Sequence, residues 1–324
     1  MYSFEQILCI IESEVNQLQF ARSPQNLYLP VQYILSLGGK RIRPALMLMA
    51  CNLYNEKVEK AVRPAIGIEL FHNFTLLHDD LIDEAEKRRN QLTVHKKWNT
   101  NTAILSGDAM LIMAYQLIAE TLHPLLKTVL DLFTQTALEI CEGQQYDMDF
   151  EMRQNVSEEE YIEMIRLKTA VLLACCLKAG ALIGGASEED AAILYQFGIL
   201  IGIAFQLQDD LLDTFGDPQT FGKNIGGDIL CNKKTFLLIQ TMLRASNQQK
   251  ELIYSFQSID KGRAEEKINA IKSIYESLNI HELTSDKIQF YFDLATKELS
   301  QLHLPVERLQ TLHATIDLLM GRKS

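Results

Sequence analysis

Two aspartate clusters with the same spacing occur in this chain. The first occupies residues 79–83 (Asp-Asp-Leu-Ile-Asp) and the second residues 209–213 (Asp-Asp-Leu-Leu-Asp), and each follows a long apolar stretch with helical periodicity. Residues four apart on a helix lie about 40° apart around its axis, so the first and last aspartates of each cluster share a face. Each cluster is therefore predicted to present a patch of carboxylates at the end of a helix.

Two such patches point to a divalent metal. Crowded carboxylates raise one another's pKa unless a cation lies between them. Hard oxygen ligands that leave positions open for water and substrate phosphates suit Mg²⁺ better than zinc or iron. The patches should bind metal weakly until a polyphosphate arrives. The alternative, two solvated helix ends with ordinary acids, is disfavoured because both clusters have apolar flanks.

A polyphosphate site also needs cations and backbone donors, and basic residues occur in tight groups. Residues 38–44 (Gly-Gly-Lys-Arg-Ile-Arg-Pro) place three cations after a glycine pair, and the double arginine 88–89 follows the first acidic cluster. Lys223 lies in a glycine-rich loop after the second cluster, and Lys233 begins the next helix. Any one of these alone would suggest an exposed helix end. Lys168 is different, because it lies in an apolar helix where a charge is costly without an anion.

The elements that must position these residues are helices. The chain has only seven prolines, its apolar residues recur at helical spacing, and no useful strand alternation is present. Ser157 and Glu160 form a predicted capping box at the start of one helix. We predict one large all-α bundle that forms a single domain over residues 1–324. The predicted helices span residues 3–21, 28–54, 57–84, 99–121, 124–149, 157–185, 187–213, 232–244, 247–257, 261–277, 283–300 and 305–320.

Composition limits the class of protein further. The 324 residues are 47% hydrophobic with a net charge of −11, which indicates a globular chain and argues against a nucleic-acid surface. The six cysteines show no C-x-x-C spacing and fit free thiols in a reducing compartment. The acidic N-terminus does not resemble a signal peptide, and Lys178 and Gln196 interrupt the two longest apolar runs. We therefore expect a soluble cytoplasmic protein without a membrane span.

Taken together and in order, these motifs resemble the trans-prenyltransferases, the polyprenyl synthetase or isoprenyl diphosphate synthase family. The resemblance runs over roughly residues 35–235. Its one departure is Asn90, which follows the double arginine where many members carry glycine. Five motifs carry it: Gly39-Lys40-Arg41-x-Arg43-Pro44, the first acidic cluster with Arg88-Arg89, Lys168-Thr169, Phe205-Gln206-x-x-Asp209-Asp210-x-x-Asp213, and Gly222-Lys223.

The resemblance implies an isoprenoid synthase bundle whose central cavity is rimmed by the two aspartate motifs. It further implies a Mg²⁺-dependent head-to-tail condensation of isopentenyl diphosphate with an allylic diphosphate (dimethylallyl, geranyl or farnesyl). The product would be an all-trans prenyl diphosphate of about 15 to 20 carbons, its length set by the depth of the apolar cavity. The proton would be lost to the departing diphosphate, and the protein would be a symmetric homodimer.

Three alternatives remain open: a longer-chain synthase, a class I terpene cyclase, and a non-catalytic partner subunit of a prenyl synthase. The second aspartate motif and the basic residues Lys40 and Arg43 count against the cyclase, and the presence of both motifs counts against the partner subunit. A di-iron bundle is disfavoured because the chain has no Glu-x-x-His pairs.

The resemblance also implies roles for individual residues. About three Mg²⁺ ions would be ligated by Asp79, Asp83 and Asp209, with Asp80, Asp210 and Asp213 in support through hydrogen bonds and water. The allylic diphosphate would be held by Arg88, Lys168, Lys223 and Lys233, and isopentenyl diphosphate by Lys40, Arg43, His72 and Arg89. The reacting centre would involve Lys168, Thr169 and Gln206.

The resemblance assigns control of product length to Phe74 and Thr75, five and four residues before the first aspartate. On an undistorted helix Phe74 lies about 140° around the axis from Asp79, whereas Thr75 lies about 40° from it. The assignment of Phe74 therefore depends on the resemblance alone.

Overall fold

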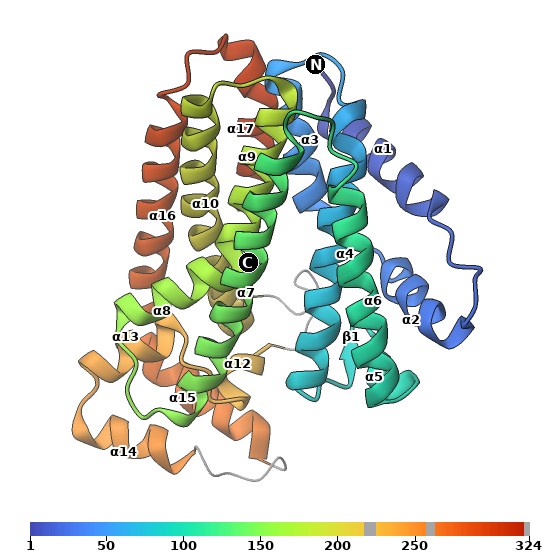
Figure 1. The fold of residues 1–324 in the computed structure, drawn as a ribbon. Coiled ribbons are helices and arrows are strands. Elements are labelled where there is room, and N and C mark those ends of the chain that lie inside the picture. Colours follow the sequence, from blue (N-terminus) through green and yellow to red (C-terminus); the bar gives the residue numbers. More distant parts are fainter. Residues whose placement is uncertain (217–224, 257–262, 321–324) are drawn as a thin grey trace. The chain divides into compact units, whose positions relative to one another are not determined.

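The computed structural model describes residues 1–216, 225–256 and 263–320. Within these ranges the regular elements are helices, apart from one hairpin of two-residue strands (Figure 1). The all-α prediction is confirmed. Two compact units make up the chain. The first comprises Met1–Gln135, Cys175–Tyr195 and Leu302–Thr315, and the second comprises Thr136–Ala174, Gln196–Gln301 and the residues from Ile316 onward.

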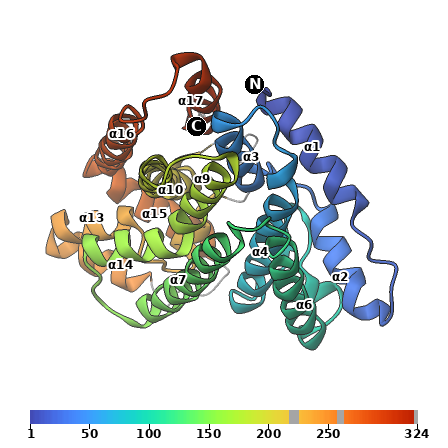
Figure 2. The same ribbon diagram turned by 45° about the horizontal axis from the view of Figure 1, so that its top comes forward.

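The first unit carries the first aspartate motif and the double arginine. Helix α4 carries the motif at its C-terminal end, and it lies beside α3 and α6 (Figures 1 and 2). Most of the first two thirds of α4 is buried, whereas in its last turn only Asp80 is buried. The elements wholly in this unit are α1 (Phe4–Gln17), α2 (Gln25–Ser36), α3 (Ile42–Tyr54), α4 (Glu59–Ile82), β1 (Lys87–Arg88), β2 (Gln91–Leu92), α5 (Val94–Lys97) and α6 (Thr100–Ile118).

The second unit carries the second aspartate motif. Leu211, inside the motif, packs in a core cluster with residues of α12, α13, α15 and α16, among them Ile229, Leu237 and Tyr275. The elements of this unit are α8 (Glu158–Ile165), the π-helix η1 (Arg166–Ala170), α12 (Gly227–Leu230), α13 (Phe236–Arg244), α14 (Asn247–Ser255), α15 (Ala264–Ser277) and α16 (Ile280–Leu299). Residues of both units belong to α7 (Leu126–Met152), α9 (Val171–Gly184), α10 (Glu188–Phe215) and α17 (Val306–Met320).

Most predicted helices are present with ends shifted by a few residues, but the helix predicted over residues 28–54 is wrong. It is two helices, because Gly38, Gly39 and Arg41 have positive φ angles of 77°, 146° and 47° that no α-helix accommodates. The β1–β2 hairpin, α5 and α12 were not predicted, because elements this short produce no periodic signal. The capping box of Ser157 and Glu160 is confirmed.

Two stretches, Glu158–Gly184 and Glu188–Phe215, are long and apolar enough to cross a membrane by length and composition. The sequence predicts that Lys178 and Gln196 leave neither stretch with an apolar run long enough to span a membrane, but by length and composition both stretches qualify. In the structure 83% of the most apolar window of the first stretch is buried, and 56% of that of the second. Burial of this kind accounts for the apolar character of helices in the core of a protein.

Candidate active site

The first aspartate motif is tied to the double arginine. Asp79 and Asp80 lie in the last turn of α4, and Asp83 is the residue that ends the helix. Carboxylates are unfavourable at a helix C-terminus, where the helix dipole is negative, so they require a counter-charge. Arg88 supplies it: its Nε lies 2.8 Å from one carboxylate oxygen of Asp80 and its Nη2 lies 2.7 Å from the other.

Asp80 is the buried member of this motif, with 4% of its surface exposed. Burial raises the pKa of its carboxyl, and the bidentate contact with Arg88 opposes that rise. The same guanidinium lies 3.9 Å from an oxygen of Asp79. The structure therefore brings Arg88 and the first motif together, with the arginine directed at the carboxylates themselves.

The β1–β2 hairpin positions the second arginine of the pair. Strand residues Lys87 and Arg88 pair with Leu92 and Gln91, and the turn residues Arg89 and Asn90 both have left-handed backbones, with φ of 51° and 62°. Two positive φ angles in a two-residue turn are the geometry of tight β-hairpins. Asparagine tolerates this conformation better than most residues. The departure from glycine at position 90 is therefore conformationally mild.

Gly39 provides the room in which the Arg89 side chain lies. A Cβ atom at position 39 would lie 2.8 Å from Nη2 and 3.0 Å from Nη1 of Arg89, closer than real side chains pack. The loop between α2 and α3 and the turn of the hairpin are thus in contact at this point. Surrounding protein and the neighbouring charge of Arg88 lower the pKa of Arg89. This guanidinium lies where an anion would stabilise it.

Arg43 and His72 form the inner part of the same basic region. Nη1 of Arg43 lies 3.0 Å from Nε2 of His72, and Nε of Arg43 is buried without a hydrogen-bond partner. Burial lowers the pKa of Arg43. Burial also lowers the pKa of His72 well below its ordinary value, and the charges of Arg43, Arg88, Arg89 and Arg41 add to the shift. His72 is thus a neutral imidazole that accepts from Arg43, because a guanidinium can only donate.

Arg41 has a structural role, in contrast to its neighbours. Its guanidinium is almost completely buried and contacts Glu69 at 2.6 Å, Glu12 at 2.9 Å and the carbonyl oxygen of Leu35 at 2.9 Å. These contacts fix the break between α2 and α3. Lys40, beside it, is exposed.

In the second unit, Asp210 lies in a buried hydrogen-bonded chain. Its Oδ2 accepts from the hydroxyl of Tyr161, and its Oδ1 lies 2.9 Å from Nε2 of Gln206. The other end of the Gln206 amide, Oε1, lies 3.0 Å from Oγ1 of Thr169. Burial and the charge of Asp228 raise the pKa of Asp210 well above its ordinary range, and the two hydrogen bonds oppose the shift. The structure thus brings three predicted site residues together.

Asp213 anchors the start of α12. Its Oδ2 accepts from the backbone N–H of Asp228 at 3.0 Å, and its carbonyl oxygen accepts from that of Gly226 at 2.6 Å. A carboxylate is favourable here because the first N–H groups of α12 have no partner within the helix. Lys267 fixes the far end of α12 through the carbonyl oxygen of Leu230. The motif therefore positions Asp228, and Lys233 follows α12 within the same unit.

Lys168 and Thr169 lie in the π-helix η1. Such a turn inserts an extra residue into a helix and is frequent at functional sites. Gly143 of α7 allows it to pack, since a Cβ at position 143 would lie 2.4 Å from the backbone nitrogen of Lys168. Nζ of Lys168 lies 2.6 Å from an oxygen of Asp147. The prediction that this lysine requires an anion is confirmed by that contact.

Phe74 belongs to an aromatic cluster in the first unit. Its ring centroid lies 5.6 Å from that of Phe71 and 4.8 Å from that of His78, and Phe71 lies 5.1 Å from Phe133. Thr75 differs, because its hydroxyl donates to the backbone carbonyl oxygen of His72 at 2.8 Å. Of the two, Phe74 has the side chain that packs among aromatic rings.

Lys223 lies outside the described residues. Three residues that contact or face the predicted residues in the second unit were not predicted from the sequence: Asp147, Tyr161 and Asp228. From the sequence, Asp147, four residues after Gly143, is expected on a solvent-exposed helix face. Tyr161 is expected to be an ordinary core residue. The third, Asp228, follows a glycine pair after the second motif, a signal that could have been recognised.

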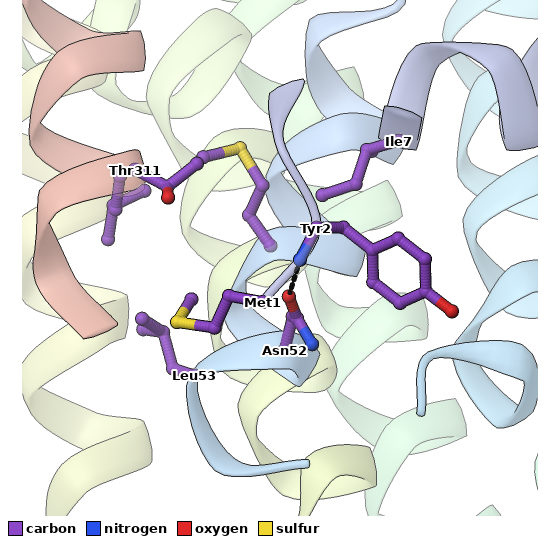
Figure 3. Close-up of a pocket in the computed structure, with 8 residues that line it drawn as sticks. Met1, Tyr2, Ile7, Asn52, Leu53 and Thr311 are labelled. Atoms are coloured by element: carbon purple, nitrogen blue, oxygen red, sulfur yellow. Dashed lines mark hydrogen bonds between the residues drawn. The ribbon is translucent and has the colours of Figure 1, made fainter. Parts of the chain in front are cut away.

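A small pocket in the first unit lacks the acidic and basic side chains of the candidate site. Figure 3 shows Met1, Tyr2, Ile7 and Leu53 around it, with the backbone N–H of Tyr2 donating to Asn52 at 2.8 Å. Its lining carries no charged side chain. It offers nothing to a diphosphate.

The described residues contain no group of three or more His, Cys, Asp or Glu side chains that could hold a metal ion by themselves. The donors present are carboxylates at the end of α4 and along the last turns of α10. Oxygen donors of this type suit Mg²⁺ when water and substrate phosphate complete its octahedral shell. The donor set fits a metal that binds together with its substrate.

An all-α chain with two aspartate motifs and a desolvated basic region has the features of a prenyltransferase. A family model described as polyprenyl synthetase matches residues 24–278. The geranylgeranyl diphosphate synthase of Methanosarcina mazei is 39% identical over 231 residues, which are 71% of this chain and 71% of that protein. That of Geoglobus acetivorans is 37% identical over 295 residues, 90% of this chain and 89% of that protein.

A crystal structure of a geranylgeranyl pyrophosphate synthase aligns with a TM-score of 0.94 at 43% identity, covering 100% of both chains. The chain belongs to the polyprenyl synthetase family. The predicted family and enzyme class, a prenyltransferase, are confirmed.

Proposed function

We propose that this chain condenses isopentenyl diphosphate head-to-tail with an allylic diphosphate and releases a short all-trans prenyl diphosphate. The observation that carries the proposal is the basic region of the first unit. Arg43 contacts His72, its Nε is buried without a hydrogen-bond partner, and burial lowers the pKa of both Arg43 and Arg89, so a bound anion would stabilise this region. A diphosphate has the charge and the acceptor oxygens that guanidinium groups bind best.

The neutral state of His72 suits this role. In the tautomer that accepts from Arg43 at Nε2, the proton resides on Nδ1, so the ring can donate a hydrogen bond without adding a charge. We assign isopentenyl diphosphate to Arg43, His72 and Arg89, together with the exposed Lys40. Because Arg88 is directed at the first aspartate motif, it would turn to the allylic diphosphate as metal occupies the carboxylates.

The second unit would serve the allylic partner. Lys168 supplies a cation for its diphosphate, and Lys233, with Lys223, would add to that binding. Thr169 and Gln206 place hydroxyl and amide oxygens close together. Oxygen dipoles of this kind can stabilise a developing allylic cation, and they are too weakly nucleophilic to trap it. The proton released after carbon–carbon bond formation would pass to the departing diphosphate.

Mg²⁺, bound with substrate at Asp79, Asp83 and Asp209, would neutralise charge on the departing diphosphate. The buried Asp80, Asp210 and Asp213 would support this site through hydrogen bonds and water, and in the structure they bond to Arg88, Tyr161 and the backbone of Asp228, respectively. By family resemblance about three ions act together.

We also propose that the whole chain works as one synthase domain, since the matched residues 24–278 include parts of both units. The protein would be soluble and cytoplasmic. It would act as a homodimer, because α6 exposes an apolar stripe of Ile104, Leu105 and Ile112 that a second copy would cover.

The test is to incubate the purified protein with Mg²⁺, labelled isopentenyl diphosphate and each of the dimethylallyl, geranyl and farnesyl primers, and to size the products. We expect all-trans products of about 15 to 20 carbons, with growth limited by the apolar wall around Phe74. Longer products would favour the longer-chain synthase. Failure to extend any primer would refute the proposal and favour a partner subunit, whereas cyclic hydrocarbons would favour a terpene cyclase.

A further inference from the structure

Tyr161 is a buried tyrosine that the chemistry above does not use. It lies in α8, one turn before the π-helix, with 2% of its surface exposed. Its hydroxyl donates to Oδ2 of Asp210. A tyrosine hydroxyl is protonated near neutral pH, so it acts here as the hydrogen-bond donor. A buried donor directed at one carboxylate oxygen fixes the rotation of that carboxylate.

Asp210 transmits this orientation to Gln206. With Oδ2 held by Tyr161, Oδ1 faces Gln206 and accepts from Nε2 at 2.9 Å. The two residues are four apart on α10, so their side chains meet on one face of the helix. An amide whose nitrogen faces a carboxylate must turn its oxygen the other way. The flip state of Gln206 is thereby set by Asp210.

Gln206 in turn determines the polarity of Thr169. Its Oε1 lies 3.0 Å from Oγ1 of Thr169, and an amide oxygen can only accept, so the hydroxyl proton of Thr169 is directed at Gln206. The lone pairs of that hydroxyl then face away from Gln206. Were the amide flipped, its NH₂ group would donate to Thr169, occupy those lone pairs and free the hydroxyl proton.

We infer that Tyr161 is a positioning residue for the condensation: through Asp210 and Gln206 it keeps the Thr169 hydroxyl turned with its lone pairs toward the developing allylic cation. The inference rests on the proposed function. It assigns Tyr161 a task different from packing, because its hydroxyl determines the direction of three consecutive hydrogen bonds. All four residues lie in the second unit.

A double-mutant cycle tests this inference. Tyr161→Phe removes the first donor and should lower kcat about tenfold, with the KM for either substrate within about twofold of wild type, because a hydrogen bond to a buried carboxylate is lost while the binding cations stay. Thr169→Val removes the last hydroxyl at nearly constant volume. In the Thr169→Val background, Tyr161→Phe should change kcat by less than about twofold, because the chain of hydrogen bonds then no longer ends at a hydroxyl. If Tyr161→Phe lowers kcat as much in the Thr169→Val background as it does in the wild type, the inference is overturned.

Tyr275→Phe is the matched control. Tyr275 is also buried in the second unit, at 3% exposure, and it packs in the core cluster around Leu211. This variant should leave kcat unchanged and lower the melting temperature no less than Tyr161→Phe does. Equal kcat losses in the two variants would show that Tyr161 contributes only packing.

A second measurement does not depend on turnover. In protein labelled with ¹⁵N at glutamine side chains, the Gln206 amide resonance, assigned by its loss in Gln206→Leu, should shift in Tyr161→Phe and stay in place in Tyr275→Phe. Asp210→Asn, which can present NH₂ to Oε1 of Gln206, should shift it further. If the Gln206 resonance does not shift in Tyr161→Phe, the inference is overturned even if the enzyme is active. A wild type without prenyltransferase activity but with the expected shifts would instead refute the proposed function.

Discussion

At the scale of single residues, His72 shows how surroundings set a side chain's role. On sequence alone it is a histidine on a helix face, and only its neighbours distinguish it. Arg43 approaches its Nε2 at 3.0 Å, and burial, together with the charges of four arginines, lowers its pKa well below the ordinary value. A charged imidazole here would repel the cations that a diphosphate needs, so neutrality serves the site.

The lowered pKa of His72 predicts a dependence of stability on pH. In the unfolded chain this histidine takes up a proton near its ordinary pKa of 6.5, whereas in the folded protein it does so only at much lower pH. The unfolded state therefore binds more protons as the pH falls below about 6.5, and the free energy of unfolding declines. His72→Gln should flatten this decline between about pH 6.5 and 5, measured by denaturant titration. The exposed His313→Gln is the control, and an equal flattening in both variants would contradict the prediction.

The aspartates give a second prediction at this scale. Asp79→Ala and Asp209→Ala should each lower kcat about a hundredfold or more, since each removes a carboxylate proposed to hold metal against the diphosphate. A chelator should abolish turnover of the wild type. The measurement is product formation at saturating Mg²⁺, with circular dichroism to show that the helices persist.

The exposed Asp286→Ala on α16 is the matched control and should keep full activity. Retention of most activity in either motif variant would contradict the two-motif mechanism.

At the scale of elements, the sequence predicted what is long and periodic and missed what is short. The predicted ends of helix α4 lie within two residues of the observed ends, because its apolar pattern and its aspartates indicate the same segment. The break between α2 and α3 was not predicted. Its cause is the left-handed backbone at Arg41, held by Glu12 and Glu69 from distant positions, and local propensity contains no trace of such contacts.

The same limit explains the site residues that were missed. Lys168 could be recognised as a charge in need of an anion, but its partner Asp147 lies 21 residues earlier on another helix. The π-turn that presents Lys168 depends on close packing against Gly143, which is a tertiary effect. Motif residues are thus predictable when their spacing is local. Their partners become visible only when the fold brings helices together.

Helix α4 carries the prediction about product length. Phe74→Ala removes most of a ring from the aromatic cluster that includes Phe71 and His78, and it opens space for a good part of one five-carbon unit. The product distribution should therefore shift upward by about one isoprene unit or more, with the first condensation nearly unchanged. Chromatographic sizing of products from the farnesyl primer measures the shift.

Thr75→Ala is the comparison on the same turn. It removes a small side chain whose hydroxyl is already bound to the helix backbone, so it should change product length less. A shift in the Thr75 variant with none in Phe74→Ala would show that the face of α4 nearest Asp79 limits the product instead.

At the scale of the whole molecule, charge and exposed apolar surface bear on assembly. The net charge of −11 keeps copies of the chain apart by non-specific repulsion, so association requires a specific surface. Leu105 and Ile112 of α6, at 59% and 61% exposure, lie seven residues apart and therefore on one face of the helix. Asp108 lies between them, which limits how the stripe can be covered.

A double substitution in this stripe tests the proposed homodimer. Leu105→Glu with Ile112→Glu replaces two large apolar side chains, each worth about 1.5 kcal/mol or more when buried, by like charges. The dissociation constant of the dimer should rise at least about a hundredfold, so that light scattering after size-exclusion chromatography detects a monomer at micromolar concentration. Leu252→Glu, an exposed leucine on α14, adds the same kind of charge elsewhere and should leave the dimer intact. A wild type that is monomeric under these conditions, or a double variant that stays dimeric, would contradict the proposal that α6 binds a second copy.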